Sequence, residues 1–207
     1  MKNLLLIVLC TTLLLNSCSS GGDVPNPIPP APSLSIGDYY QGGVIFYLDT
    51  FGGGLIADIS DLGIASWGCY GLIVGTQSGI GTGFENTQNI INANCQNINN
   101  TAAGMCYNSN RGGYSDWFLP SIYELYAMWD YYLLIDSVSV LYGGDVFVST
   151  LPNSQGSPNT CYYSSTESDY VPSNNALSHF VLLKSPTLDY YKSAGHNVRA
   201  IRAFSND

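Results

Sequence analysis

The segment from Asp116 to Leu125 constrains the fold most, because it predicts a chain that runs extended and then turns into a helix. Ser121 and Glu124 have the spacing of a capping box, in which each side chain binds the backbone N–H of the other residue. Pro120 lies just before the cap and stiffens the entry. Apolar residues then recur at helical spacing, at Ile122, Leu125, Tyr126, Trp129 and Leu133. We therefore expect a helix that begins at Ser121 and buries one apolar face.

Apolar runs on either side of this helix predict strands and further helices. Residues 44–48 and 55–59 flank a Gly-rich turn and are typical of a hairpin. Helical patterns run from Asn86 or Thr87 to Cys95 and from Thr101 to Cys106. Other strand patterns lie at residues 146–148, 161–165, 176–183, 188–191 and 198–204. This order predicts an α+β fold, an antiparallel sheet with two to three helices and long loops, in which the first and last strands share one sheet.

The N-terminus predicts a secretory signal that ends at a lipidation site. Lys2 precedes an apolar run over residues 4–15, which is too short to span a bilayer. The run leads to Cys18 in the pattern of a lipobox, in which the cysteine becomes the first residue and carries acyl chains such as palmitate. The alternative is an ordinary secretory signal with an incidental cysteine. We expect residues 1–17 to be removed and Cys18 to hold the chain on a membrane of the cell envelope, the outer membrane, facing either the periplasm or the surface.

A proline-rich segment follows the expected lipid anchor. Five of the ten prolines lie between residues 19 and 36, which favours an extended, stiff tether. Residues 18–36 are thus expected to form a lipidated tether, and residues 37–207 one domain. The formal net charge is −9, so the surface should repel nucleic acid and other polyanions. Sixteen tyrosines, among many glycines, serines and asparagines, predict a polar but largely uncharged exterior with aromatic faces.

Four cysteines remain in the expected domain, namely Cys69, Cys95, Cys106 and Cys161. An even number in an oxidising compartment predicts two disulfides, with three possible connectivities. We favour Cys95–Cys106 with Cys69–Cys161, because a short loop joins two helical patterns between the first two. A zinc site is not expected, since no two cysteines are close in sequence and His179 and His196 lack ligand-like spacing. The sequence predicts no metal and no cofactor.

Several short motifs occur in the order found in one known family. They are Trp67-Gly68-Cys69, Ile80-Gly81-Thr82-Gly83, Asn86-Thr87, two cysteines around Ala102-Ala103, residues 116–121 with Glu124-Leu125, residues 163–167 and residues 198–204. From Gly42 to Phe204 the chain resembles the Lcl C-terminal domain family of bacterial surface proteins and lipoproteins. The resemblance implies a C-type-lectin-like fold with the chain ends paired in one sheet, and a role as an adhesin that binds host or extracellular polysaccharide.

The sequence departs from this pattern in two respects. Adhesion to sulfated glycans needs a cationic surface, whereas this domain is acidic. The Glu-Pro-Asn and Trp-Asn-Asp signatures of calcium-dependent lectins are absent from the sequence. Asp58 and Asp61 are candidate calcium ligands, but their spacing is not that of an EF-hand.

The charged residues favour structural roles over catalytic ones. Arg199 and Arg202 lie on opposite faces of the predicted last strand, so we expect a buried arginine paired with Glu124 or Glu167. Residues 164–166 and His179 lack a nucleophile elbow, and residues 75–83 lack the lysine of a P-loop. No pair of carboxylates has the pattern of a glycosidase. We therefore expect no enzyme.

Aromatic residues in the long loops are the remaining candidates for ligand binding. They are Trp67, Tyr70, Tyr162 and Tyr170. Trp67 also fits a buried core, as does Tyr163, which follows Tyr162 in the sequence. This leaves Tyr70 and Tyr170 as the better candidates for exposed residues. The sequence thus predicts a surface-anchored lipoprotein that binds a glycan or a surface protein in adhesion. The alternative is a structural or accessory lipoprotein of the envelope or a fimbria, with only protein partners.

Overall fold

The computed structural model describes residues 33–147, 160–180 and 188–205. The predicted signal peptide, Cys18, most of the tether, the loop before Thr160 and the end of the strand predicted at 176–183 lie outside the described residues. The chain divides into two compact units, residues 1–33 and residues 34–207, and every helix and strand below belongs to the second. Within the described residues, no helix has both the length and the apolar character needed to span a bilayer.

The first sheet joins the two ends of the described chain. It consists of β1 (Tyr39–Tyr40), β2 (Gly43–Leu48), β3 (Gly54–Asp58) and β9 (Ile201–Phe204), in the order β1-β2-β3-β9, with antiparallel pairing throughout. The predicted hairpin is β2–β3, and the prediction that the first and last strands share a sheet is confirmed. Leu34 and Ile36 already pack on the outer side of this sheet, against Ile45, Ile56 and Phe204. The compact unit therefore begins three residues before the predicted boundary at 37.

The second sheet is built mostly from the later part of the chain. Its strands are β4 (Gly63–Ala65), β8 (His196–Val198), β5 (Cys161–Glu167), β6 (Asn175–Phe180) and β7 (Leu188–Tyr191), in the order β4-β8-β5-β6-β7. The β5–β8 pair is parallel and the others are antiparallel. Two strand predictions were wrong. Val146 and Phe147 are not in a strand, and residues 198–204 do not form one strand, because β8 ends at Val198 in one sheet and β9 begins at Ile201 in the other.

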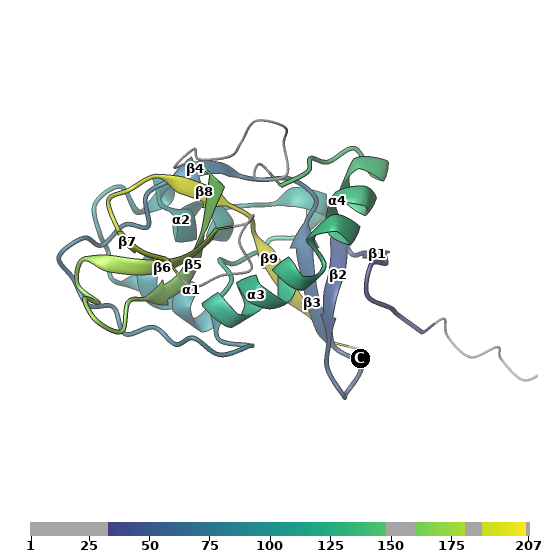
Figure 1. The fold of residues 1–207 in the computed structure, drawn as a ribbon, viewed down its shortest axis with the longest axis horizontal. Helices are drawn as coiled ribbons and strands as arrows, with labels where there is room; N and C mark the ends of the chain where they lie inside the picture. Colours follow the sequence, from purple (N-terminus) through teal and green to yellow (C-terminus); the bar gives the residue numbers. More distant parts are fainter. Residues whose placement is uncertain (1–32, 148–159, 181–187, 206–207) are drawn as a thin grey trace, which may run out of the picture. The chain divides into compact units, whose positions relative to one another are not determined.

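Within residues 33–147 the sheets are covered by four α-helices, α1 (Gly83–Asn92), α2 (Ala102–Tyr107), α3 (Ile122–Asp130) and α4 (Tyr132–Leu141). The 3-10 turns η1 (Ile98–Asn100) and η2 (Arg111–Gly113) lie in the same range. In Figure 1, α4 lies over the first sheet, α3 lies between the two sheets and contacts β2, β5 and β6, and α1 and α2 lie beside the second sheet. The result is an α+β fold with long loops, as the sequence predicted. Leu133 was expected on the buried face of the capped helix, but the helix ends at Asp130 and Leu133 is exposed on α4.

The extended segment before α3 links the two halves of the core. Phe118 exchanges two backbone hydrogen bonds with Ile201 of β9, at N···O distances of 2.8 and 3.0 Å. Its ring packs in the cluster between the first sheet and the helices α3 and α4. The preceding Trp117 and the following Leu119 point into the cluster around Trp67, on the side of α1 and α2. Successive side chains of this extended segment thus point in opposite directions, and the segment contributes to both clusters.

Candidate functional site

The predicted cap of α3 is formed, and it also holds a loop. Ser121 accepts a hydrogen bond from the Glu124 amide, and Glu124 accepts one from the Ser121 amide at 2.6 Å. The same carboxylate accepts from the Gly81 amide at 2.8 Å. Burial raises the pKa of Glu124, and these backbone donors oppose that rise. Glu124 is therefore a structural residue that ties the 79–83 loop to α3, and it is not the partner of an arginine.

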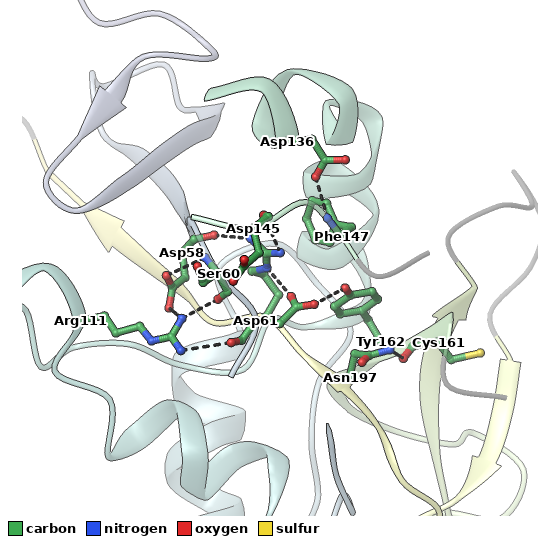
Figure 2. Close-up of polar contacts among 11 residues, drawn as sticks. Asp58, Ser60, Asp61, Arg111, Asp136, Asp145, Phe147, Cys161, Tyr162 and Asn197 are labelled. Atoms are coloured by element: carbon green, nitrogen blue, oxygen red, sulfur yellow. Dashed lines mark hydrogen bonds and ion pairs between the residues drawn. The ribbon is translucent and has the colours of Figure 1, made fainter. Parts of the chain in front are cut away.

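Arg199 lies between the two sheets, where the chain crosses from β8 to β9. Its side chain is fully buried, and its Nε donates to Asp61 at 2.5 Å. Its other nitrogens donate to the carbonyl oxygens of Asp58 and Asp145, and the guanidinium lies 4.3 Å from the centre of the Phe147 ring. Figure 2 shows the acceptor residues converging, with the Tyr162 hydroxyl donating to the same Asp61 carboxylate. Arg199 thus connects both sheets.

Arg202 makes a separate ion pair at the edge of the first sheet. Its guanidinium donates two hydrogen bonds to the Asp116 carboxylate, at 2.8 and 2.7 Å, and lies 3.9 Å from the centre of the Tyr114 ring. One buried arginine paired with an acid was predicted; both arginines are buried and paired, and the acids are Asp61 and Asp116. The prediction of Glu124 or Glu167 as the partner was wrong, because both of those carboxylates serve loops of the other half of the domain.

A groove of about 320 Å³ opens beside the Arg199 network. It is lined by Tyr39, Gly42, Asp58, Ile59, Ser60, Arg111, Gly112 and Asp145. Arg111 donates to the Asp58 carboxylate at 3.2 Å and to the carbonyl oxygens of Ser60 and Asp61 (Figure 2). The candidate calcium ligands Asp58 and Asp61 are therefore both engaged by arginines. Within the described ranges, no cluster of three or more histidine, cysteine or acidic side chains is arranged to hold a metal ion.

Glu167 instead pairs with a lysine beneath the long loop that follows β4. Lys192 is buried, and its Nζ lies 2.6 Å from the Glu167 carboxylate, 2.8 Å from the Leu72 carbonyl oxygen and 4.3 Å from the centre of the Trp67 ring. Glu167 also accepts from the amides of Val74 and Gly75 at 2.8 Å. The ion pair fixes the backbone of residues 72–75, where the side chains of Leu72 and Ile73 are exposed and that of Val74 packs on the core. Lys192 lies in no recognisable motif, so its pairing with Glu167 was not predicted from the sequence.

The same loop carries the disulfide that the structure contains, Cys69–Cys95. The predicted pairs Cys95–Cys106 and Cys69–Cys161 were wrong. Cys106 faces inward from α2 and lies in the core cluster around Trp67, and Cys161 is buried on β5, so both are free thiols. Burial raises the pKa of the Cys106 thiol well above its ordinary value. The bond joins the loop after β4 to the chain that follows α1.

Exposed apolar and tyrosine side chains lie on this braced loop, on the neighbouring loop between β5 and β6 and at the end of β7. We call them the loop patch; its members are Tyr70, Leu72, Ile73, Tyr170, Val171 and Tyr191. The rings of Tyr70 and Tyr191 lie 6.5 Å apart, and the Gly71 amide donates to the Ser173 carbonyl oxygen, which joins the two loops. Ile73 is 67% exposed and Tyr170 is 90% exposed. The sequence predicted Tyr70 and Tyr170 here but missed Leu72 and Ile73, whose signal is a run of three apolar residues between Gly71 and Gly75.

Two of the predicted ligand-binding aromatics are not at the surface. Trp67 is buried, and its indole N–H donates to the Ser164 carbonyl oxygen at 2.8 Å. Tyr162 is buried against Phe147 and donates to Asp61. Tyr162 lies on β5, which is buried along its whole length, and Trp67 follows β4 and packs in a core cluster with Ile90, Ala103 and Trp117. They are therefore not ligand contacts, and that part of the prediction was wrong.

The residues considered for nucleophilic catalysis are also engaged in the fold. The hydroxyls of Ser164 and Thr166 donate to the backbone carbonyls of Leu177 and Gln77, and Asn86 donates to the Ser165 hydroxyl. The His179 ring packs on the rings of Tyr126 and Trp129. A search of the sequence against protein-family models found no match, and a search against curated proteins found none either.

Proposed function

We propose that this chain is a lipid-anchored surface protein of the Lcl C-terminal type, whose C-type-lectin-like domain binds a glycan or a surface protein through the loop patch. The observation that carries this proposal is the patch itself. Six side chains lie exposed on the loop after β4, on the loop between β5 and β6 and at the end of β7, and a buried ion pair and a disulfide fix the backbone of the first of these loops. Exposed apolar clusters of this kind mark binding surfaces, and a rigid base reduces the entropy that binding costs.

The chemistry of the patch suits a neutral ligand. Tyrosine rings present apolar faces on which the C–H groups of a sugar or the side chains of a protein can pack, and their hydroxyls remain in water. All four basic residues that the structure describes are paired with acids. The described surface therefore offers little cationic charge to a sulfated or phosphorylated polymer. We propose a binding role rather than a catalytic one on this basis.

A glycan array probed with the domain tests the ligand. We expect binding to neutral glycans that the double substitution Tyr70→Ala and Tyr170→Ala weakens by about tenfold or more, since each aromatic contact contributes on the order of 1 kcal/mol. Tyr123→Ala is the matched control, because Tyr123 is also an exposed tyrosine but lies on α3. Equal affinity of the double variant and the wild type would exclude the loop patch as the ligand surface. No glycan binding, with co-purification of an envelope complex, would favour the accessory role.

The anchor is tested separately. Labelled palmitate should be incorporated into the wild type and not into the Cys18→Ala variant, and only the wild type should sediment with membranes. A wild-type protein that incorporates no labelled palmitate and remains in the soluble fraction would contradict the lipid anchor. It would leave the ligand measurement on the domain unaffected.

A further inference from the structure

Helix α4 exposes an apolar face where a surface helix usually exposes a polar one. Leu133, Leu134, Ser137, Val140 and Leu141 are all exposed, and they follow the spacing of a single helical stripe. Leu133 is 63% exposed and Leu141 is 78% exposed. The buried face of the helix instead carries Ile135, Asp136 and Ser139. We call the exposed stripe the α4 face.

The α4 face carries no charge, and aromatic residues with polar tips flank it. Asp136 is the helix's acidic residue, and it points inward to accept from the Phe147 amide at 2.8 Å (Figure 2). Tyr131 caps the start of the helix and Tyr142 its end, and both are exposed. An uncharged apolar stripe between tyrosines is the composition of a helix that lies at a membrane interface, where the aromatic rings occupy the headgroup level.

The chain enters the compact unit on this helix. Gly37 packs so closely on Leu134 that a Cβ at position 37 would lie 2.6 Å from the leucine Cδ2. The ring of Tyr39 stacks on that of Tyr142, with their centres 3.8 Å apart. Between Cys18 and Leu34 there are sixteen residue steps. A chain of that length spans at most about 50 Å, so a lipid on Cys18 would keep the α4 face within reach of the bilayer.

We propose that the α4 face docks on the lipid bilayer that holds the anchor; this inference rests on the proposed lipidation of Cys18. The contact is apolar rather than ionic, since the chain carries a formal net charge of −9 and the face has no basic residue. Docking by α4 turns the loop patch away from the membrane, because β6, β7 and their loops lie at the opposite end of the domain from α4 and β1 (Figure 1). The ligand surface then faces outward.

Lipid-specific quenching tests the docking. The lipidated chain, with a fluorophore attached at Ser137→Cys, is reconstituted in phosphatidylcholine vesicles that contain lipids brominated on their acyl chains. The native thiols Cys106 and Cys161 are buried, so labelling under native conditions is directed to the introduced cysteine. We expect bromine to quench the probe at position 137, with no effect of added salt. A probe at Glu85→Cys, on the exposed side of α1, should not be quenched.

The double substitution Leu133→Asp and Leu141→Asp should abolish the quenching at position 137 while the chain still floats with the vesicles. Phe51→Asp makes the same exchange at the exposed tip of the β2–β3 hairpin and should leave the quenching unchanged. A floating chain with no quenching at 137 would overturn the docking but not the anchor. Equal quenching at 137 and 85, or quenching that survives the double substitution, would also overturn it. If a second copy of the chain or another of its segments covered α4 in place of the bilayer, the probe at position 137 would not be quenched. A chain that does not float would overturn both proposals.

Discussion

His179 shows how burial fixes the charge of a single residue in this domain. Its ring lies 5.0 Å from the centre of the Tyr126 ring and 5.7 Å from that of Trp129. No described group lies within hydrogen-bonding distance of either ring nitrogen. Burial lowers the pKa of His179 to about 4, although the nearby charge of Asp130 opposes the shift. The imidazole is therefore neutral at neutral pH, and it packs as an aromatic residue.

The lowered pKa predicts a loss of stability in mild acid. Between the unfolded pKa of 6.5 and the folded pKa of about 4, the unfolded chain binds the proton and the folded chain does not, so stability falls as the pH falls through this window. His179→Phe removes this contribution. The free energy of unfolding of the wild type should fall by on the order of 2 kcal/mol more than that of the variant between pH 7 and pH 4. Urea titrations across this range measure the difference, and parallel pH profiles would contradict it.

The ionic residues show what sequence could and could not predict at this scale. With few basic residues in a long chain, a buried arginine needs an acidic partner, and that reasoning was correct for Arg199 and Arg202. The identity of the partner was not predictable. Asp61 lies 138 residues away in an irregular loop, and no periodicity in the sequence records which loop faces which strand. The same holds for Lys192, which pairs with Glu167 across the long loop.

At the scale of elements, the beginning of α3 was predictable and its end was not. The capping box is a local code of four residues, and the structure contains it as predicted. The break before α4 has no glycine or proline to signal it, and the apolar spacing continues through Tyr131 into the next helix. For the helix predicted from Asn86 or Thr87 to Cys95, the predicted start was wrong. The helix begins at Gly83, because a residue without a side chain can approach the Glu124 carboxylate closely there.

Ser121 should be among the most sensitive small residues of the domain. Its hydroxyl accepts from the Glu124 amide and donates to the Gly79 carbonyl oxygen at 2.8 Å, and it is fully buried. Ser121→Ala leaves both groups without this partner, so we expect a loss of about 2 kcal/mol in the free energy of unfolding. Ser137→Ala, on the exposed face of α4, should cost less than about 0.5 kcal/mol. Urea unfolding of both variants measures the contrast, and equal losses would refute the structural importance of the cap.

The whole domain depends on one crossing of the chain between its two sheets. Residues 198–204 alternate in a way that predicts a single strand, and nothing in their pattern marks the passage at Arg199 and Ala200. Local periodicity finds many of the extended segments but cannot assign them to sheets, since sheet membership depends on contacts between distant residues. The prediction of the disulfide pairs was wrong for the same reason. Cys69 and Cys95 meet only because the loop after β4 returns to the chain end of α1.

The crossing predicts which of the two arginine ion pairs matters more to stability. Arg199→Met leaves the Asp61 carboxylate buried without its cation and takes a donor from the carbonyl oxygens of Asp58 and Asp145. Breaking a buried pair of this kind costs about 3–5 kcal/mol, because the remaining charge is not hydrated. Arg202→Met is the matched control. Its partner Asp116 is 49% exposed, so water can hydrate the carboxylate that is left behind, and the cost should be smaller.

Urea unfolding followed by tryptophan fluorescence measures both variants, because Trp117 and Trp129 lie in different core clusters. The loss for Arg199→Met should exceed that for Arg202→Met by about 2 kcal/mol. Both clusters should also lose stability together, since Arg199 follows β8 of the second sheet, donates to Asp58 of β3 and pairs with Asp61, which also holds Tyr162 of β5. A larger loss for Arg202→Met would show that the edge of the first sheet, and not the crossing, limits the stability of the domain.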